Sequence, residues 1–401
     1  MTKSGLKDTS VFTPIKVGNV TLSHRVAHLP TTRFRASEDG TPSNLQLQYY
    51  KDRSATPGTL LVTEATDTSF KLGHYPNVPG IYTDKHAAGW KEITDAVHAN
   101  GSAVAVQLWA LGRVAPPEVS KARNVPLIGP SAIYHDEETR EKAVKIGHEL
   151  RSLTEEEIHD IIYNQYTNAA KKALDAGFDF IEVHSANGYL LEQFLHPSSN
   201  KRNDRYGGSI ENRARLLFEI IDHLLTFVPA EKLAVRLSPW NTFQGILAEN
   251  EEISPVVIHS YIASELQKRA NAGKKLAYVS LSYGSITTPD KYGFTYDNTF
   301  FLQIWKGIVL RGGQNSSTTD FSGLPAETDD GRTLVGFGRH FIANPDLVKR
   351  IEQGWELNKY DRSTFYVYSN EGYNTYPTYE DKSEVDIEAA RAQLAEALIS
   401  E

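Results

Sequence analysis

The chain has 401 residues, of which 40% are hydrophobic and 23% charged, and its formal net charge is −8. This composition is ordinary for a globular protein with a large core, and the lack of a long charged block argues against nucleic acid or an anionic membrane as the main partner. There is no cysteine, which excludes disulfides, thiolate metal ligands and a cysteine nucleophile.

The chain starts without the apolar core of a signal peptide, and no apolar stretch is long enough to span a membrane. We therefore expect a cytoplasmic protein that binds a small-molecule substrate, as a monomer or a homodimer.

Short β-branched runs alternate with segments of helical period, a pattern typical of βαβ units and a parallel sheet. A short hairpin is predicted first, at 12–22. Buried parallel strands read as nearly continuous apolar runs, and eight such runs occur at 25–29, 59–63, 103–108, 178–183, 233–237, 277–281, 307–310 and 333–337. Eight strands with helices between them favour a closed barrel over an open doubly wound sheet, and no GxGxxG follows the first strand.

Helices are predicted between these strands. Thr154 and Glu157 have capping-box spacing at the start of one helix, and Gly177 ends that helix just before the fourth strand. Others are expected near 87–99, 210–225, 255–271 and 345–353. The prediction is an α/β fold, a single (β/α)₈ TIM-barrel domain over 1–401. The barrel, its N-terminal β-hairpin cap and extra loop elements occupy about 10–380, and a C-terminal helical tail occupies 381–401.

Unusual polar residues stand at the ends of the predicted strands, where barrel enzymes place their active sites. Arg236 lies inside an apolar strand. It either pairs with a buried carboxylate or presents a fixed positive charge to an anionic ligand, and its barrel position favours the ligand. His184 and Asn187 could donate hydrogen bonds to a carbonyl or an oxyanion, and Tyr189 could give a proton. Asn187-Gly188 could also be only a turn.

Glycines follow the last two strands, at Gly312-Gly313 and Gly338-Arg339. Many barrels bind phosphate here through backbone N–H groups, but tight βα turns would need the same glycines. The 13 histidines form no HExxH or comparable cluster, and GxSxG is absent, so we predict no metal site and no serine nucleophile. Isomerase or aldolase chemistry would need a metal or a Schiff-base lysine, and no predicted strand ends in lysine.

The segment HSANGYLL at 184–191, followed by NKRNDRYGGSIENR at 200–213, resembles the signature of the old yellow enzyme family of FMN-dependent ene-reductases. Further matches, in order over essentially the whole chain, are FTP at 12–14, VQLW at 106–109, VRLSP at 235–239, GFGRHFIANP at 336–345 and, as in fungal members, KYDRSTFY at 359–366. The resemblance implies an NADPH dehydrogenase that reduces the activated C=C bond of enones and enals, with nitroalkenes and quinones as further candidates.

The resemblance also implies roles for individual residues. FMN would be bound noncovalently, with Thr32 at the flavin O4 edge, Gln107 at the pyrimidine side and Arg236 near N1 and O2. Pro30 and Thr31 would also bind the cofactor. The phosphate would be held by Gly312, Gly313, Gly338 and Arg339, and Phe365 would pack against the ring system. NADPH would be the transient hydride donor.

In the same scheme His184 and Asn187 would bind the carbonyl oxygen of the substrate, and Tyr189 would protonate Cα. The substrate pocket would also be lined by Tyr75, Trp109, Phe243, Phe300 and Tyr366. A flavin-assisted isomerase on the same barrel is one alternative, because it would use the same residues. A non-catalytic steroid- or phenol-binding flavoprotein is another, although an intact set of His184, Asn187 and Tyr189 argues against lost activity.

Overall fold

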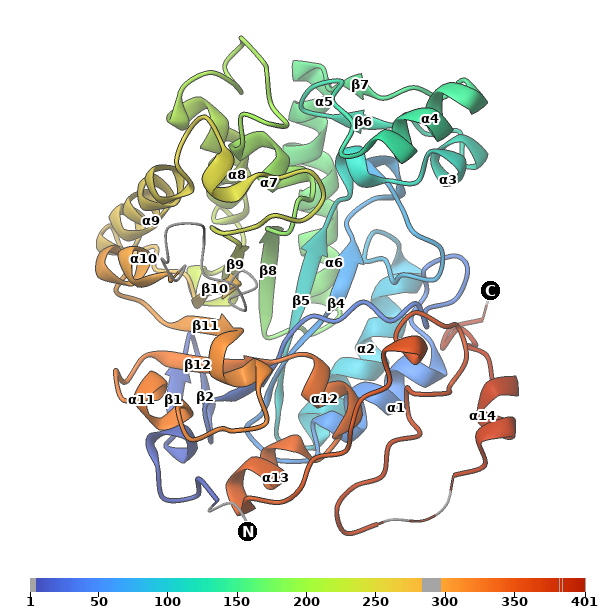
Figure 1. Cartoon of the computed structure of the whole chain (residues 1–401), viewed down its shortest axis with the longest axis vertical. Helices are drawn as coiled ribbons and strands as arrows, with labels where there is room; N and C mark the ends of the chain where they lie inside the picture. Colours follow the sequence, from blue (N-terminus) through green and yellow to red (C-terminus); the bar gives the residue numbers. More distant parts are fainter. Residues whose placement is uncertain (1–4, 283–296, 382, 384, 401) are drawn as a thin grey trace.

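The centre of the molecule is a closed barrel of eight parallel strands in the order β10-β11-β12-β3-β4-β5-β8-β9 (Figure 1). The structure is a computed structural model that describes residues 5–282, 297–381, 383 and 385–400. The strands are β3 (Val26–His28), β4 (Leu60–Asp67), β5 (Ala103–Trp109), β8 (Phe180–Ser185), β9 (Leu233–Leu237), β10 (Tyr278–Ser282), β11 (Val309–Gly312) and β12 (Thr333–Phe337). Each predicted strand overlaps one of these, so the predicted (β/α)₈ barrel is confirmed.

The predicted hairpin closes the amino-terminal end of the barrel. Strands β1 (Ile15–Val17) and β2 (Val20–Leu22) pair antiparallel around Gly18, whose φ of 52° favours glycine. Apolar side chains of the hairpin pack against residues at the amino-terminal ends of the barrel strands, including Leu60, Ala103 and Phe180. Because this end is filled, ligands must approach from the carboxyl ends of the strands.

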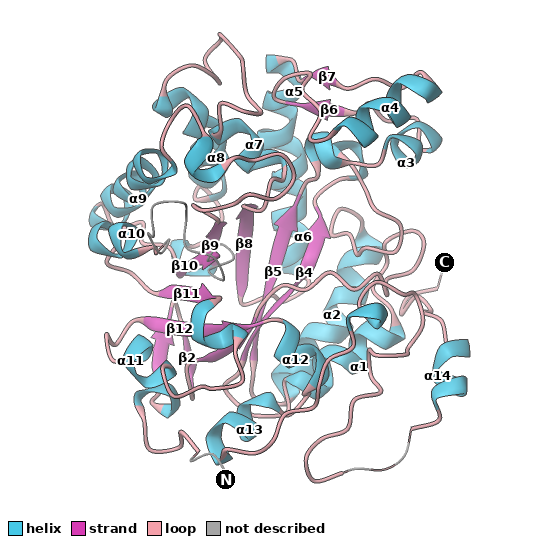
Figure 2. Cartoon of the chain, in the orientation of Figure 1, coloured by secondary structure: helices cyan, strands magenta, loops and turns pink. Residues whose placement is uncertain are grey.

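Helices surround the barrel (Figure 2). They are α1 (Asn44–Arg53), α2 (Asp84–Ala99), α5 (Glu155–Asp160), α6 (Thr167–Asp175), α7 (Leu190–Leu195), α8 (Ile210–Leu224), α9 (Pro255–Asn271), α10 (Thr299–Ile304), α11 (Leu324–Thr328), α12 (Arg339–Ala343) and α13 (Leu347–Gln353). The capping box of Thr154 and Glu157 is present, and Gly177 has the left-handed φ of 83° expected after a helix end. The predicted helix between them contains a π-helical segment, Ile161–Tyr166, that joins α5 to α6.

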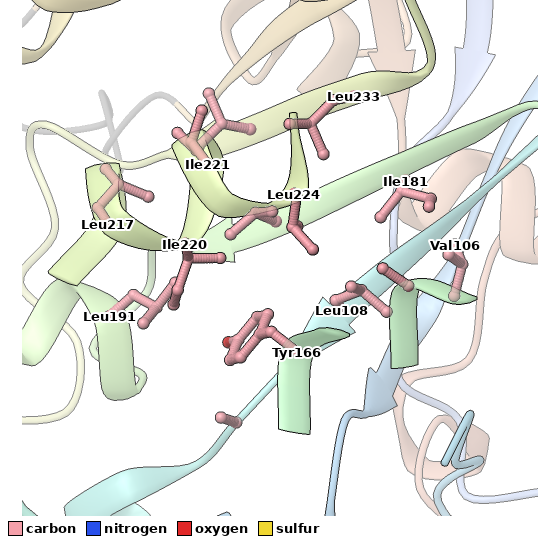
Figure 3. Packing of buried hydrophobic residues seen from close by; sticks show 14 of the residues in the cluster. Val106, Leu108, Tyr166, Ile181, Leu191, Leu217, Ile220, Ile221, Leu224 and Leu233 are labelled. Carbon is pink, nitrogen blue, oxygen red and sulfur yellow. The ribbon is translucent and has the colours of Figure 1, made fainter. Parts of the chain in front are cut away.

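The main core lies between the outer face of the barrel and these helices. Figure 3 shows α8 placing Leu217, Ile220, Ile221 and Leu224 against the strands that carry Val106, Leu108, Ile181 and Leu233. All of these side chains are at most 1% exposed. Burying a side chain of this size contributes about 1.5–3 kcal/mol, so the strands that carry the candidate site are held in a rigid scaffold.

A long excursion separates β5 from α5. It contains α3 (Pro117–Ala122), the short parallel pair β6 (Ile128–Gly129) and β7 (Arg151–Ser152), and α4 (Glu137–Ile146), which lie together at one end of the molecule (Figure 1). The C-terminal segment contains α14 (Ile387–Ala392) and then runs back beside α1, where the Leu398 N–H donates to the Pro42 carbonyl at 2.9 Å. In the described part of the chain, no helix is both long and apolar enough to cross a membrane.

Candidate active site

The carboxyl ends of the strands enclose a cavity of about 160 Å³. Its walls bring together residues from five barrel strands or the loops that follow them: Pro30, Thr32, Ala65, Gln107, His184, Asn187, Tyr189, Arg236 and Phe243. All of these except Ala65 were predicted as site residues. Ala65 enters the wall because β4 runs on past its predicted end, with a register shift between Val62 and Ala65 that turns this part of the strand.

Buried polar side chains form the floor of the cavity. In the barrel register Gln107 stands beside Glu182, and His184 stands beside Arg236. The Gln107 amide donates to the Glu182 carboxylate at 2.6 Å, and Glu182 is 0% exposed. Burial raises the pKa of Glu182, while the nearby Arg236 guanidinium acts in the opposite direction. Sequence reasoning missed Glu182, although its place two residues before His184 puts both side chains on one face of β8.

Two hydrogen-bond donors of Arg236 have no acceptor among the described residues. Its Nη2 donates to the Ser282 hydroxyl at 2.9 Å, but Nε and Nη1 are closed off from solvent and find no acceptor in residues 5–282 and 297–400 as far as they are described. Burial lowers the pKa of Arg236, and Glu182 partly offsets this effect. Orphaned donors on a cation beside a cavity fit a ligand that brings acceptor atoms or negative charge.

His184 is arranged as a neutral hydrogen-bond donor. The Ala186 N–H donates to Nδ1 of His184 at 3.2 Å, which assigns the ring proton to Nε2. Burial, together with the positive charge of Arg236, lowers the pKa of His184 well below its ordinary value. At neutral pH the ring is therefore uncharged and can donate through Nε2.

Asn187 lies in a turn and also lines the cavity, so the two interpretations of this residue are compatible. Asn187 and Gly188 have φ values of 55° and 79°. The Asn187 N–H donates to the Ser238 hydroxyl at 2.7 Å, and its carbonyl accepts from the Gln244 amide at 3.0 Å. A Cβ atom on Gly188 would lie 2.6 Å from that of Gln244, so the turn requires glycine there.

Tyr189 lines both the first cavity and a second one of about 280 Å³, which we call the outer cavity. Its ring stands edge-on to Trp109 at 4.8 Å and to His184 at 5.2 Å. Burial raises the pKa of Tyr189, so the side chain is a neutral phenol. The outer cavity is lined by Tyr75, His135, Asp136, Tyr189, Phe243, Gln244 and Gly245.

Comparison with known proteins identifies the family. Residues 10–358 match the model of the NADH:flavin oxidoreductase / NADH oxidase family. The chain belongs to this family. It is 50% identical over 390 residues to a probable NADPH dehydrogenase of Candida albicans, covering 95% of this chain and 93% of the relative. It is 43% identical over 384 residues to enoate reductase 1 of Kluyveromyces lactis, covering 94% and 96%.

A solved structure gives the same result. The chain is similar to the crystal structure of old yellow enzyme from Pichia sp. AKU4542, with a TM-score of 0.93, 44% identity, and coverage of 98% of this chain and all of that one. The resemblance to the old yellow enzyme family is thus confirmed, and the protein is an FMN-dependent oxidoreductase that uses NADPH.

The residues predicted for the phosphate side of FMN lie at the carboxyl ends of β11 and β12, and none of them lines either of the two cavities. Gly313 has a φ of 119°, and its N–H donates to the Ser316 hydroxyl at 3.1 Å. Gly312 has a structural reason of its own, because a Cβ atom there would lie 2.4 Å from the Leu29 side chain. The Thr31 methyl group lies 3.4 Å from where Gly338 would carry a Cβ. Arg339 is exposed and its guanidinium lies 3.4 Å from the Tyr360 hydroxyl.

The remaining aromatic predictions fall in different places. Phe365 is buried, and Tyr366 is 62% exposed and tilted against Phe34 at 5.6 Å. Tyr75 stacks on Trp109 at 6.0 Å and borders the outer cavity. Phe300 lies on α10 against Trp240 at 6.1 Å and lines neither cavity in the described part of the chain.

Proposed function

We propose that this enzyme reduces the C=C bond of α,β-unsaturated carbonyl compounds, with His184 and Asn187 binding the carbonyl oxygen and Tyr189 supplying a proton. The observation that carries the proposal is the shared cavity, which places these three side chains beside Gln107 and Arg236. Enones and enals are the primary substrates in this scheme, and nitroalkenes and quinones present the same acceptor chemistry.

The cofactor would be held by Thr32, Gln107 and Arg236, with the glycines after β11 and β12 and Arg339 toward its phosphate. The two donors of Arg236 that lack an acceptor in the described residues support this assignment, because the pyrimidine edge of a flavin offers acceptor atoms. When bound, FMN would supply the hydride chemistry that links oxidation of NADPH to reduction of the β-carbon of the substrate.

The donor pair His184 and Asn187 stabilises the charge that develops on the substrate. Negative charge grows on the carbonyl oxygen as the β-carbon gains hydrogen. The Nε2–H of His184 and the side-chain amide of Asn187 would both donate hydrogen bonds to that oxygen, and neither group is charged. The low dielectric constant of the cavity strengthens both hydrogen bonds. Because the turn already holds Asn187, little reorganisation is needed during the reaction.

Tyr189 completes the reaction at the α-carbon. Its phenol is protonated throughout the physiological range, because burial raises the pKa of Tyr189. Proton transfer to Cα balances the hydride at Cβ, so the substrate gains the two hydrogens of a saturated bond, and water restores the proton of the phenol. A positioned acid of this kind contributes about 10²–10⁴-fold to the rate.

The test separates the two halves of the cycle in Tyr189→Phe. The ring contacts with Trp109 and His184 are kept, so folding and FMN content should be unchanged. Stopped-flow absorbance at the flavin band, without oxygen, should show normal bleaching by NADPH and at least 100-fold slower recovery with cyclohexenone. Nitroalkenes, whose anions need little help with protonation, should still restore the flavin absorbance.

Wild-type protein that shows no NADPH-dependent reduction of any enone would refute the proposed function. Equal losses in both halves for Tyr189→Phe would instead assign Tyr189 a structural role. No loss in either half would assign the proton to water or to another residue.

A further inference from the structure

The turn that carries Asn187 rests on a carboxylate that the proposed chemistry does not use. Glu192, on α7, is 0% exposed. Its Oε2 accepts from the Gly188 N–H at 2.5 Å and from the Asn241 amide at 2.8 Å, and its Oε1 accepts from the Ser238 hydroxyl at 2.5 Å. Since Ser238 accepts in turn from the Asn187 N–H at 2.7 Å, both backbone N–H groups of the turn lead to this one carboxylate.

A second buried carboxylate lies behind the first. His196 is 0% exposed and stands between Glu192 and Glu251, with nitrogen–oxygen distances of 3.8 and 3.6 Å. Glu251 accepts from the Ser198 N–H at 3.0 Å and from the Leu247 N–H at 3.2 Å. Neither ring nitrogen of His196 has a hydrogen-bond partner in the described part of the chain. Glu192 itself therefore joins the loop after β8, through Gly188, to the loop after β9, through Ser238 and Asn241.

We propose that Glu192 is a positioning residue that sets the orientation of the Asn187 side chain toward the substrate oxygen, acting through Ser238 and Gly188. The inference rests on the proposed function, in which Asn187 is a donor to that oxygen. Two consecutive residues with positive φ form this turn, and within the described residues only one backbone hydrogen bond closes it, from the Tyr189 N–H to the Ala186 carbonyl at 3.2 Å. The carboxylate adds charge-assisted hydrogen bonds, to Gly188 directly and to Asn187 through Ser238. Glu192 itself lines neither cavity, so it acts on the ligand only through the turn.

The test measures binding of para-chlorophenol to the FMN-loaded enzyme, followed by its long-wavelength charge-transfer absorbance. Its phenolate oxygen stands in for the carbonyl oxygen of a substrate. Glu192→Ala should raise the Kd about tenfold without changing FMN content per chain, because the donors assigned to FMN come from other strands. Ser238→Ala should raise the Kd about fivefold. Glu192→Gln keeps an acceptor for the Gly188 N–H and should raise the Kd only two- to threefold.

A background variant shows whether the effect passes through Asn187. Asn187→Gly removes the amide and tolerates the positive φ of this position. In that background, Glu192→Ala should change the Kd by less than twofold. The control is Glu219→Ala, on α8. It removes a carboxylate that accepts from the Tyr206 hydroxyl and should leave the Kd unchanged.

Two results would overturn the inference. One is a Kd within twofold of wild type in both Glu192→Ala and Ser238→Ala, and Ser238→Ala alone decides the matter if Glu192→Ala does not fold. The other is an effect of Glu192→Ala that persists in full in the Asn187→Gly background. Absence of the charge-transfer band in the wild-type enzyme would count against the proposed function instead, so the two failures are distinguishable.

Discussion

Arg35 fastens the segment that carries Phe365 and Tyr366 to the loop after β3. It is 0% exposed, and its guanidinium uses all five N–H groups on backbone carbonyls. The acceptors, at 2.7–3.0 Å, are the carbonyls of Arg33, Thr364, Phe365, Ser369 and Glu371. The guanidinium also lies over the Tyr373 ring at 4.8 Å. Arg35→Met should therefore destabilise the packing of this segment against the loop after β3.

The expected loss follows from the carbonyls that the substitution leaves unpaired. An orphaned buried acceptor costs about 1–3 kcal/mol, and the substitution orphans the buried carbonyls of Arg33 and Thr364. The Phe365 carbonyl keeps its hydrogen bond from Nε of Arg33 at 3.0 Å. Burial lowers the pKa of Arg35 to about 10, so removing the charge recovers part of that cost. The free energy of unfolding should fall by about 2 kcal/mol, near the lower limit for the two carbonyls. Arg35→Lys, with three donors for five acceptors, should lose less.

Urea unfolding followed by tryptophan fluorescence measures this loss. The matched control is Arg391→Met, because Arg391 also binds the same segment, through Glu371, but is 53% exposed. An exposed ion pair contributes about 0–1 kcal/mol, so this variant should stay close to wild type. The reasoning fails if Arg35→Met destabilises the protein no more than Arg391→Met does.

Three further changes test the site. Arg236→Met removes a positive charge and donors that have no acceptor among the described residues. The variant should hold less FMN, and its flavin reduction potential, measured by dye equilibration, should fall by tens of millivolts. Unchanged occupancy and potential would exclude Arg236 from the flavin site. His184→Ala should abolish the charge-transfer band of para-chlorophenol, and a surviving band would assign the anion to other donors. Burial raises the pKa of Glu64 from 4.5 to about 6, so its contribution to stability is full below pH 4.5 and is lost as pH rises through about 6. Glu64→Gln should remove about 2 kcal/mol of this pH dependence from the unfolding free energy, and an unchanged profile would contradict it.

The sequence predicted the barrel because parallel strands buried on both faces are nearly continuous apolar runs. It did not predict the last part of β4. Residues Glu64 to Asp67 are polar or small yet buried, because Arg33 donates its N–H to Glu64 and His74 lies 2.5 Å from Asp67. Hydrogen-bond partners from distant segments cannot be recognised in the local sequence, so the strand is predicted to end at residue 63. The π-helical segment before α6 was not predicted for a similar reason, since its apolar spacing resembles that of an α-helix.

The candidate site was predictable where the strand-end rule and the family signature pointed to the same residues, as at His184, Asn187 and Arg236. Glu182 could have been found from the alternation of β8, since a charged residue inside a buried strand needs a partner. Glu192 could not. A glutamate on a one-turn helix reads as a solvated residue, and only the fold shows that this carboxylate faces the turn beside the substrate site.

The residue type at position 187 satisfies two demands that pull in different directions. The turn holds this residue at a φ of 55°, which costs most side chains about 1–2 kcal/mol and glycine almost nothing. Glycine, however, would remove the donor from the cavity. Asparagine tolerates the left-handed conformation better than most residues and still carries an amide that reaches the cavity. The residual cost is offset by hydrogen bonds from outside the turn, which join it to Ser238, Gln244 and Glu192. In the proposed function, a donor held in this way would be oriented before the substrate arrives, which is the condition under which a single amide can contribute to stabilising an oxyanion.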